Sequence, residues 1–306
     1  MTDPRAVADA AAVAAALTAH GYLPDEGLAT SIFLALRLER PLLLEGEPGV
    51  GKTEVARVLA DWVGGPLVRL QCYEGIDAAQ AVYEWDHARQ LLHLRTAEAT
   101  GRAVDTTDTA LEDELYDERF LVRRPLLQAI AAGDGPPPVL LIDEVDRADD
   151  EFEAYLLEIL ADYSVTVPEV GTFRAERPPV VIVTSNRTRD VHDALKRRCL
   201  YHWVEHPDPA REVAIIALRA PEVGERLARQ VAAATESIRA VGLYKPPGVA
   251  ETIDGARALT LLGDDELVAE HVEATLGTLL KYREDQNRVR DHDLHALVAG
   301  ARAAHA

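Results

Sequence analysis

The sequence predicts an α/β protein with a five-stranded parallel sheet flanked by helices, followed by a smaller domain built only of helices. Two observations predict this fold. Between residues 42 and 204, short and nearly continuous apolar runs alternate with helical stretches, as in parallel sheets that are buried on both faces. From Glu212 onward the strand signal stops and the chain reads as helix. We therefore expect an α/β domain over residues 1–207 and a helical domain over residues 208–306.

Each expected element rests on a local pattern. The five apolar runs that predict strands are residues 42–44, 67–70, 139–142, 180–183 and 201–204. A helix is expected at the Ala-rich residues 6–17. Another is expected after Glu151, where one face carries Phe152, Tyr155, Leu156, Ile159 and Leu160. In the second domain, residues 245–248 break the helical pattern and Gly263 ends a helix.

Two stretches interrupt the alternation of strands and helices. Residues 165–173 place β-formers on either side of Pro168 and Gly171, which predicts a β-hairpin. Residues 71–138 are longer than a crossover helix needs, and they include an acidic portion around Glu112, Asp113 and Glu114. Insertions on a rigid scaffold commonly contact partners, so we expect partner contacts here.

Composition and charge limit the class of protein. The 306 residues are 48% apolar and 27% charged, which excludes a disordered or fibrous chain. Against 52 acidic residues stand 32 Lys and Arg, a net charge of −20 that repels phosphate backbones. We therefore expect no nucleic-acid partner. A local basic groove that binds nucleic acid is the remaining alternative.

Compartment and redox state follow from what the sequence lacks. Cys72 and Cys199 are too few for a disulfide framework or a metal cluster, which predicts two reduced, buried thiols. No apolar stretch reaches the length of a membrane span. The N-terminus carries Asp3 and Asp9 and does not fit a signal peptide, so a cytoplasmic protein is expected.

A phosphate-binding motif follows the first expected strand. The spacing G-x-x-x-x-G-K-[ST] is met by Gly46, Glu47, Pro48, Gly49, Val50, Gly51, Lys52 and Thr53, and a helix with Glu54 follows directly. Backbone N–H groups of such a loop surround phosphate oxygens, Lys52 reaches the β- and γ-phosphates and Thr53 ligates Mg²⁺. The alternative is a Gly-rich turn without a ligand. The strand–loop–helix context favours nucleotide binding, with residues 46–54 as the candidate site.

Polar residues end the third and fourth expected strands. Asp143 and Glu144 close a buried apolar run, where an Asp can hold Mg²⁺ and a Glu can polarise the attacking water. Asn186 ends the next strand and could orient that water. The alternatives are a solvated acidic strand end and an Asx-turn or helix-cap asparagine. Together with the phosphate loop, these residues predict hydrolysis of a nucleoside triphosphate.

Three arginines are further candidates. Arg197 and Arg198 precede the last expected strand and could reach the γ-phosphate on a neighbouring subunit, or form a solvated basic helix end. Arg257 lies on a helix of the second domain and could contact nucleotide from that side, or be a surface charge. Sequence spacing alone does not distinguish a role at the nucleotide from a surface charge for these arginines.

In order, the segments GEPGVGKT, VLLIDEVD, TSN, KRRC and GAR resemble the Walker A, Walker B, sensor 1, arginine finger and sensor 2 elements of AAA+ ATPases. The sequence is most similar to the CoxD-like subgroup of the MoxR family. Four further segments support this, namely residues 25–30, 185–189, 196–203 and 245–252.

This resemblance implies a P-loop NTPase of the AAA+ class that uses ATP and Mg²⁺ and forms a hexameric ring. It implies that Arg198, more than Arg197, is the finger and that Arg257 is sensor 2. The hairpin would be the pre-sensor-1 insertion and residues 71–138 would hold the helix-2 insertion. The implied partners are a von Willebrand factor A domain protein and a metalloenzyme client, a carbon monoxide dehydrogenase-like molybdenum hydroxylase.

The implied role is chaperone-like remodelling during metalloenzyme maturation. The nearest candidate for a pore loop is Tyr73-Glu74-Gly75, which departs from the family pattern and favours local remodelling over threading. Two other functions stay open. One is a nucleic-acid motor or loader, which DNA-stimulated hydrolysis would indicate. The other is a nucleotide-gated scaffold with negligible hydrolysis.

Overall fold

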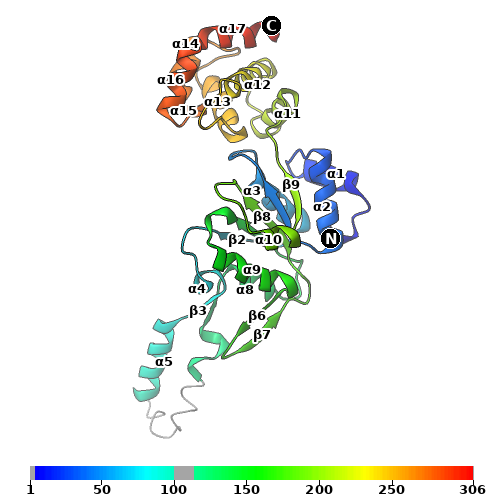
Figure 1. Ribbon diagram of the computed structural model, residues 1–306, viewed down its shortest axis with the longest axis vertical. Helices are drawn as coiled ribbons and strands as arrows, with labels where there is room; N and C mark the ends of the chain where they lie inside the picture. The colour runs from blue at the N-terminus through cyan, green and yellow to red at the C-terminus, as the bar shows by residue number, and fades with distance from the viewer. Residues whose placement is uncertain (1–3, 100–113, 306) are drawn as a thin grey trace. The chain divides into compact units, whose positions relative to one another are not determined.

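The computed structural model describes residues 4–99 and 114–305 (Figure 1). The chain divides into two compact units that alternate along the sequence. Unit 1 comprises Met1–Ala10, Thr30–Leu44 and Leu59–His202, and unit 2 comprises Ala11–Ala29, Glu45–Val58 and Trp203–Ala306. A hydrophobic core lies in each unit. The domain boundary at residue 207 stays a prediction.

The central sheet has five strands, as predicted, and their order is β2-β5-β8-β1-β9. Its strands are β1 (Leu42–Glu45), β2 (Leu67–Gln71), β5 (Val139–Asp143), β8 (Val180–Ser185) and β9 (Leu200–Trp203). The pairs β2–β5 and β5–β8 are parallel, with Gln71 opposite Asp143 in the first. Every residue of β1, β5 and β8 is buried, which explains their continuous apolar runs.

Helices flank this sheet. They are α2 (Glu26–Leu38), α3 (Lys52–Val63), α8 (Pro125–Ile130), α9 (Asp150–Asp162) and α10 (Asp193–Arg198). The predicted helix after Glu151 is α9, which begins where the Asp149 side chain accepts a hydrogen bond from Phe152 N. Its apolar face, including Leu156, packs into the core of unit 1. Short 3₁₀ turns lie at Pro4–Ala6, Glu118–Phe120 and Val145–Arg147.

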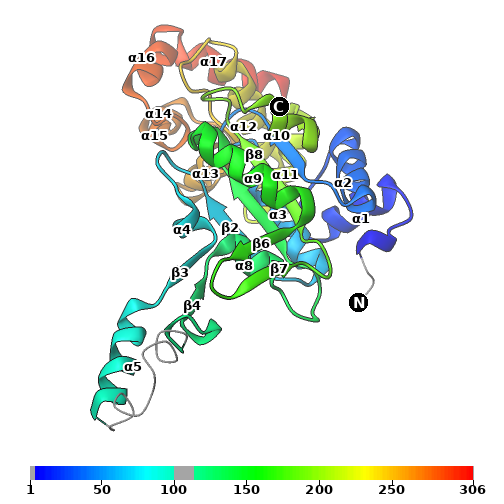
Figure 2. The same ribbon diagram turned by 60° about the horizontal axis from the view of Figure 1, so that its bottom comes forward.

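Both interruptions of the alternating pattern contain additional strands in unit 1. The predicted hairpin is formed by antiparallel β6 (Ser164–Val167) and β7 (Gly171–Arg174). The long segment holds α4 (Ala78–Ala81), β3 (Tyr83–Trp85), α5 (His87–Ala99) and β4 (Leu121–Arg123), with β3 and β4 antiparallel. Figure 2 shows β3, β4 and α5 extending away from the central sheet. Glu112 and Asp113 of the acidic portion lie outside the described residues.

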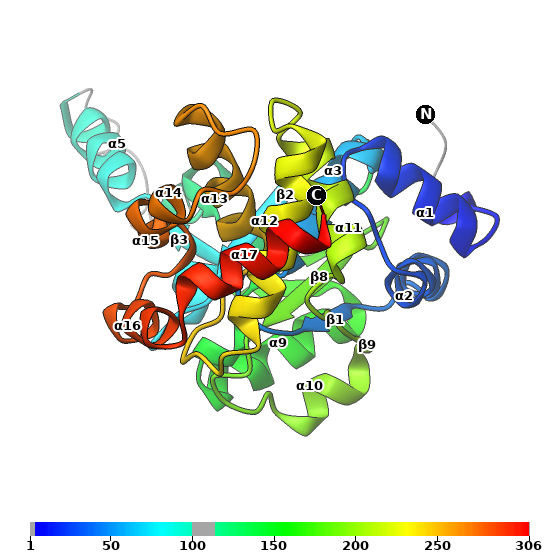
Figure 3. The ribbon, with the colours of Figure 1, turned by 90° about the horizontal axis from the view of Figure 1, so that it is seen from above.

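Unit 2 contains the helical C-terminal part, as predicted. Its helices are α1 (Ala10–Ala19), α11 (Pro209–Arg219), α12 (Glu225–Arg239), α13 (Val249–Leu261), α14 (Ala269–Ala274), α15 (Leu276–Leu279), α16 (Arg283–Asp291) and α17 (Leu294–Ala304). The predicted break at residues 245–248 separates α12 from α13. Figure 3 shows α17 lying across α12, with which it packs in one core. In the described part of the chain, no helix combines the length and apolar character needed to cross a membrane.

Candidate nucleotide site

The phosphate loop belongs to unit 2 and connects β1 to α3. Gly49 and Gly51 have φ angles of +81° and +97°, which side chains disfavour and which turn the loop back on itself. Helix α3 begins at Lys52, so the loop ends on the N-terminus of a helix, where the partial positive charge favours an anion. This local geometry fits a phosphate group.

Lys52 is buried and folds over the loop. Its Nζ donates hydrogen bonds to the carbonyl oxygens of Gly46 and Glu47, both at 2.8 Å. A buried ammonium needs such partners, because an unpaired charge is strongly disfavoured away from water. The contacts hold the Lys52 charge against the predicted phosphate site. Thr53, the predicted magnesium ligand, is the next residue of α3.

A cavity of about 210 Å³ adjoins the loop within unit 2. Its lining includes the segment Gly21–Leu23, the loop with Gly49–Gly51 and Glu54, and apolar residues of α11 and α13 such as Ile215 and Ile253. A mostly apolar cavity with a few polar groups at its edge suits a planar base joined to phosphates. The residues present therefore fit a nucleotide.

Helix α13 begins directly on the phosphate loop. Val249 N donates to Gly49 O at 3.0 Å, and a Cβ added at Gly248 would lie 2.7 Å from the Gly49 Cα. Only glycine allows this approach of two backbone segments. The start of α13 is thereby fixed to the loop.

Glu54 and Arg219 meet at the edge of the cavity. Burial raises the pKa of the Glu54 carboxyl, but hydrogen bonds from Arg57 and Arg219 outweigh this, so its pKa lies below the usual value. Arg257 lies farther along α13 and donates to Glu222 Oε1 at 2.8 Å and to Arg219 O at 2.6 Å. Arg257 thus contacts the end of α11. Sequence reasoning missed Arg219, because no motif marks the end of α11.

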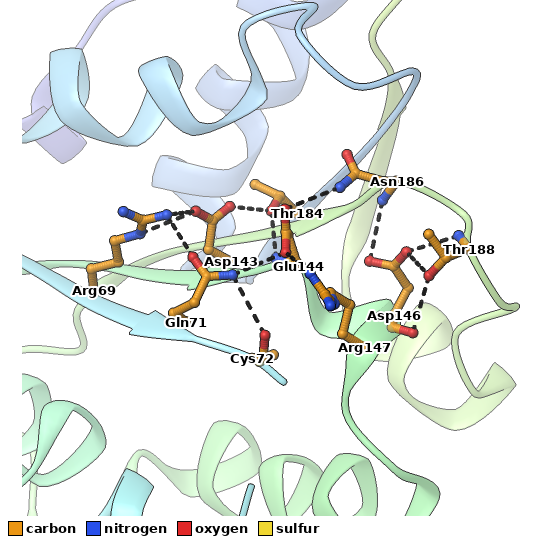
Figure 4. A network of polar contacts seen from close by, with 10 residues as sticks. All are labelled: Arg69, Gln71, Cys72, Asp143, Glu144, Asp146, Arg147, Thr184, Asn186 and Thr188. Carbon is orange, nitrogen blue, oxygen red and sulfur yellow. Dashed lines mark hydrogen bonds and ion pairs between the residues drawn. The ribbon is translucent and has the colours of Figure 1, made fainter. Parts of the chain in front are cut away.

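The predicted acids lie in unit 1, at the end of β5 (Figure 4). Asp143 is buried, and its Oδ1 accepts a hydrogen bond from Thr184 Oγ1 at 2.6 Å. The same hydroxyl oxygen accepts from Glu144 N at 2.9 Å. Glu144 has a φ of +56°, an uncommon left-handed conformation that directs the chain out of the strand. Thr184 on the neighbouring strand therefore fixes both acids.

Two residues of β2 also hold these acids. Arg69 donates to Asp143 Oδ2 through Nε at 3.1 Å and through a terminal nitrogen at 2.6 Å. The Gln71 amide accepts from Arg69 at 2.5 Å and donates to Glu144 Oε2 at 3.1 Å. Sequence reasoning missed both. Their alternation with buried Val68 and Leu70 was a signal that one face of the strand is polar, but the strand order was needed to place them beside β5.

Asn186, which follows β8, lies beside Glu144. Asn186 Nδ2 is 3.4 Å from Glu144 Oε1, a long hydrogen bond, and Asn186 N donates to Asp146 Oδ1 at 3.2 Å. The buried Asp146 also accepts from Thr188 N and Oγ1 at 2.8 and 2.7 Å. Asp146, another residue missed from the sequence, thus holds the turn that presents Asn186.

Arg197 and Arg198 end α10 in unit 1, and both are exposed. Arg198 donates to Leu157 O at 2.7 Å, in α9 of the same subunit. Basic side chains at the C-terminal end of a helix interact favourably with its dipole. The position is therefore compatible both with a solvated basic helix end and with the predicted role in a neighbouring subunit.

The oxygen ligands available suit Mg²⁺, which takes one or two protein ligands and completes its shell with phosphates and water. Thr53 in unit 2 and Asp143 in unit 1 each carry a side-chain oxygen of this kind. Among the residues that the structure describes, no group of three or more His, Cys, Asp or Glu could form a metal cage. Cys72 and Cys199 are free and buried as predicted, and burial raises the pKa of each thiol to about 12.

The parallel sheet and its phosphate loop define the protein as a P-loop NTPase. Residues 41–199, more than half of the chain, match the AAA domain (dynein-related subfamily), and the chain belongs to this family. AAA domains bind nucleotide, usually with Mg²⁺, and usually act as oligomers.

Several proteins are similar to this chain. An uncharacterized protein of Staphylococcus epidermidis is 24% identical over 257 residues, which cover 82% of this chain and 87% of that protein. An uncharacterized protein of Staphylococcus saprophyticus is 22% identical over 269 residues, or 86% and 91% of the two chains. Midasin of Giardia intestinalis is 47% identical over 49 residues, which are 16% of this chain and 1% of midasin.

Proposed function

We propose that this protein is a Mg²⁺-dependent ATPase that remodels a protein client. The observation that carries the proposal is the phosphate loop, with Lys52 buried against it and a base-sized cavity beside it. The acids at the end of β5 supply the groups that hydrolysis needs.

The proposed roles follow from the chemistry of each residue. Mg²⁺–ATP supplies the γ-phosphoryl group and the cation that neutralises its charge. Lys52 binds phosphate oxygens, while Thr53 and Asp143 hold the metal. Glu144 orients and polarises the water. Asn186 orients the same water, and its 3.4 Å contact with Glu144 supports this role.

We further propose that the protein acts as a ring, a hexamer by analogy with MoxR proteins. Arg198 or Arg197 would contact the γ-phosphate bound by the adjacent subunit, and Arg257 would act as sensor 2. Both finger candidates are exposed residues, which supports a contact outside their own subunit. The resemblance to CoxD-like proteins supports a von Willebrand factor A domain partner and a molybdenum hydroxylase client.

A Glu144→Gln variant tests this function, because it should bind ATP and barely hydrolyse it. The variant, loaded with ATP and Mg²⁺, is used to capture proteins from a native lysate of the source cells. We expect a von Willebrand factor A protein or a metalloenzyme subunit that is released when nucleotide is removed. Lys52→Ala, which should bind no ATP, is the control.

Three results would change the proposal. Nucleic acid captured in place of protein would contradict the proposed substrate class. Equal capture by Glu144→Gln and Lys52→Ala would contradict nucleotide control of the client. Partner binding with a hydrolysis rate that is the same in wild type and Glu144→Gln would indicate a scaffold.

A further inference from the structure

A turn between α2 and β1 contacts the end of α10, and both lie in unit 1. The Arg40 guanidinium donates to the carbonyl oxygen of Arg197 at 2.9 Å and to that of Arg198 at 3.2 Å. A longer contact of 3.4 Å reaches the carbonyl oxygen of Cys199. One side chain thus spans three successive backbone groups at the position of both finger candidates.

Independent contacts hold the turn that carries Arg40. Glu39 has a φ of +53°, and its carbonyl oxygen accepts a hydrogen bond from Tyr163 Oη at 3.0 Å. The Glu39 carboxylate pairs with Arg5 at 2.9 Å. On the other side, Leu200 N donates to Pro41 O at 2.8 Å. Arg40 therefore projects from a fixed point toward α10.

Attraction between charged side chains does not explain the contact of Arg40 with the end of α10. Arg40 lies beside Arg197 and Arg198, and like charges repel. The favourable interaction is with the last carbonyl groups of α10, which lack partners within the helix and carry its negative dipole end. A guanidinium can bridge several such acceptors, because its donors form a rigid planar fork.

We propose that Arg40 is a positioning residue for the arginine finger. It fixes the backbone of residues 197–199, so that Arg197 and Arg198 project from a defined point toward the adjacent subunit. Arg40 itself touches no nucleotide in this proposal. The inference rests on the proposed function, since it requires a finger that acts between subunits.

The test measures ATP hydrolysis and nucleotide affinity of Arg40→Ala rings. We expect turnover to fall roughly ten- to a hundredfold, because misplacement of a catalytic group by about 1 Å has effects of this size. Affinity for a fluorescent ATP analogue should not change. Arg37→Ala is the matched control, because Arg37 lies in the last turn of α2, close to Arg40 in the sequence, and donates a hydrogen bond to Val7 O at 3.3 Å without contacting α10. Arg40→Lys should retain only part of the activity. Its ammonium group still donates hydrogen bonds, but it lacks the planar fork that bridges several carbonyl groups.

Mixed rings separate positioning from a general structural role. Lys52→Ala subunits bind no ATP but keep an intact finger, so they should restore hydrolysis at the sites of Arg40→Ala subunits. Arg198→Ala and Arg197→Ala mixed with Lys52→Ala are the reference mixtures.

The outcomes are distinct. Recovery in the Arg40→Ala mixture and in a reference mixture supports the inference. Recovery in a reference mixture alone, or wild-type turnover by Arg40→Ala, overturns the role of Arg40 and leaves the proposed ATPase intact. No recovery in any mixture of stable rings contradicts the finger between subunits and the inference with it.

Discussion

At the scale of single residues, Asp143 is shared between a predicted metal and an arginine. Arg69 binds Asp143 Oδ2 at 2.6 Å, and Thr184 binds Oδ1. A guanidinium on the carboxylate opposes a second cation there. Because the Arg69 side chain is 53% exposed, solvent screens much of this repulsion. We therefore expect Arg69 to weaken binding of the proposed metal modestly while it orients the acid.

Arg69→Gln should therefore bind Mn²⁺, used as a spectroscopic probe for Mg²⁺, more tightly in the presence of ATP. We expect a gain of roughly threefold, about 0.7 kcal/mol, as for other screened charge pairs. Electron paramagnetic resonance titration measures it. Arg147→Gln is the control, since Arg147 pairs with Glu144 at 3.3 Å and not with Asp143. Weaker Mn²⁺ binding by Arg69→Gln would show that orientation outweighs repulsion.

His206 is a half-buried residue between two cavity-lining positions, Glu205 and Pro207. Its ring nitrogens have no hydrogen-bond partner in the part of the chain that the structure describes. Burial, aided by the charges of Arg239 and Lys52, lowers the pKa of His206 from 6.5 to about 4. The folded protein therefore keeps this imidazole neutral where the unfolded chain protonates it.

The free energy of unfolding should fall as the pH drops from 6.5 toward about 4, because the unfolded state binds the additional proton. His206→Asn should reduce this fall, whereas His295→Asn, at an exposed position, should not. Denaturant unfolding at about pH 7 and about pH 5 measures the difference. An identical pH dependence in wild type and His206→Asn would contradict the assignment.

At the scale of elements, sequence patterns predict the central sheet well. All five strands lie where nearly continuous apolar runs occur, and β1, β5 and β8 are buried along their whole length. The hairpin formed by β6 and β7 was equally visible from its turn residues. The side chains of other strands that contact the two acids could not be predicted in this way. Arg69 and Gln71 reach Asp143 and Glu144 only because β2 lies next to β5, and strand order is not encoded by local periodicity.

The start of α13 gives a prediction at the same scale. Gly248→Ala should destabilise the protein by roughly 1–3 kcal/mol, because its Cβ would collide with backbone that has no room to yield. It should also weaken nucleotide binding by moving α13 from the phosphate loop. Gly300→Ala in α17 meets open space and should be neutral or stabilising. Thermal unfolding and nucleotide titration measure both effects. Wild-type behaviour of Gly248→Ala would show that this contact is dispensable.

At the scale of the whole molecule, the two units carry complementary parts of the proposed reaction. Unit 2 contains the phosphate loop and the cavity, and unit 1 contains Asp143, Glu144 and the finger candidates. The proposed chemistry requires both sets of residues. Substitution of a proposed catalytic or phosphate-binding residue in either unit should therefore abolish turnover, but only substitutions in the phosphate loop should abolish nucleotide binding.

The most direct test of the ATPase compares ATP binding and Mg²⁺-dependent hydrolysis in wild type, Glu144→Gln and Lys52→Ala. Glu151→Gln is the control, because it removes the same charge at an exposed position of α9. We predict that Glu144→Gln binds ATP like wild type and hydrolyses it at least about a hundredfold more slowly, the usual contribution of a general base. Lys52→Ala should not bind ATP, and Glu151→Gln should match wild type. Wild-type turnover by Glu144→Gln, or ATP binding that is unchanged in Lys52→Ala, would contradict the central claim.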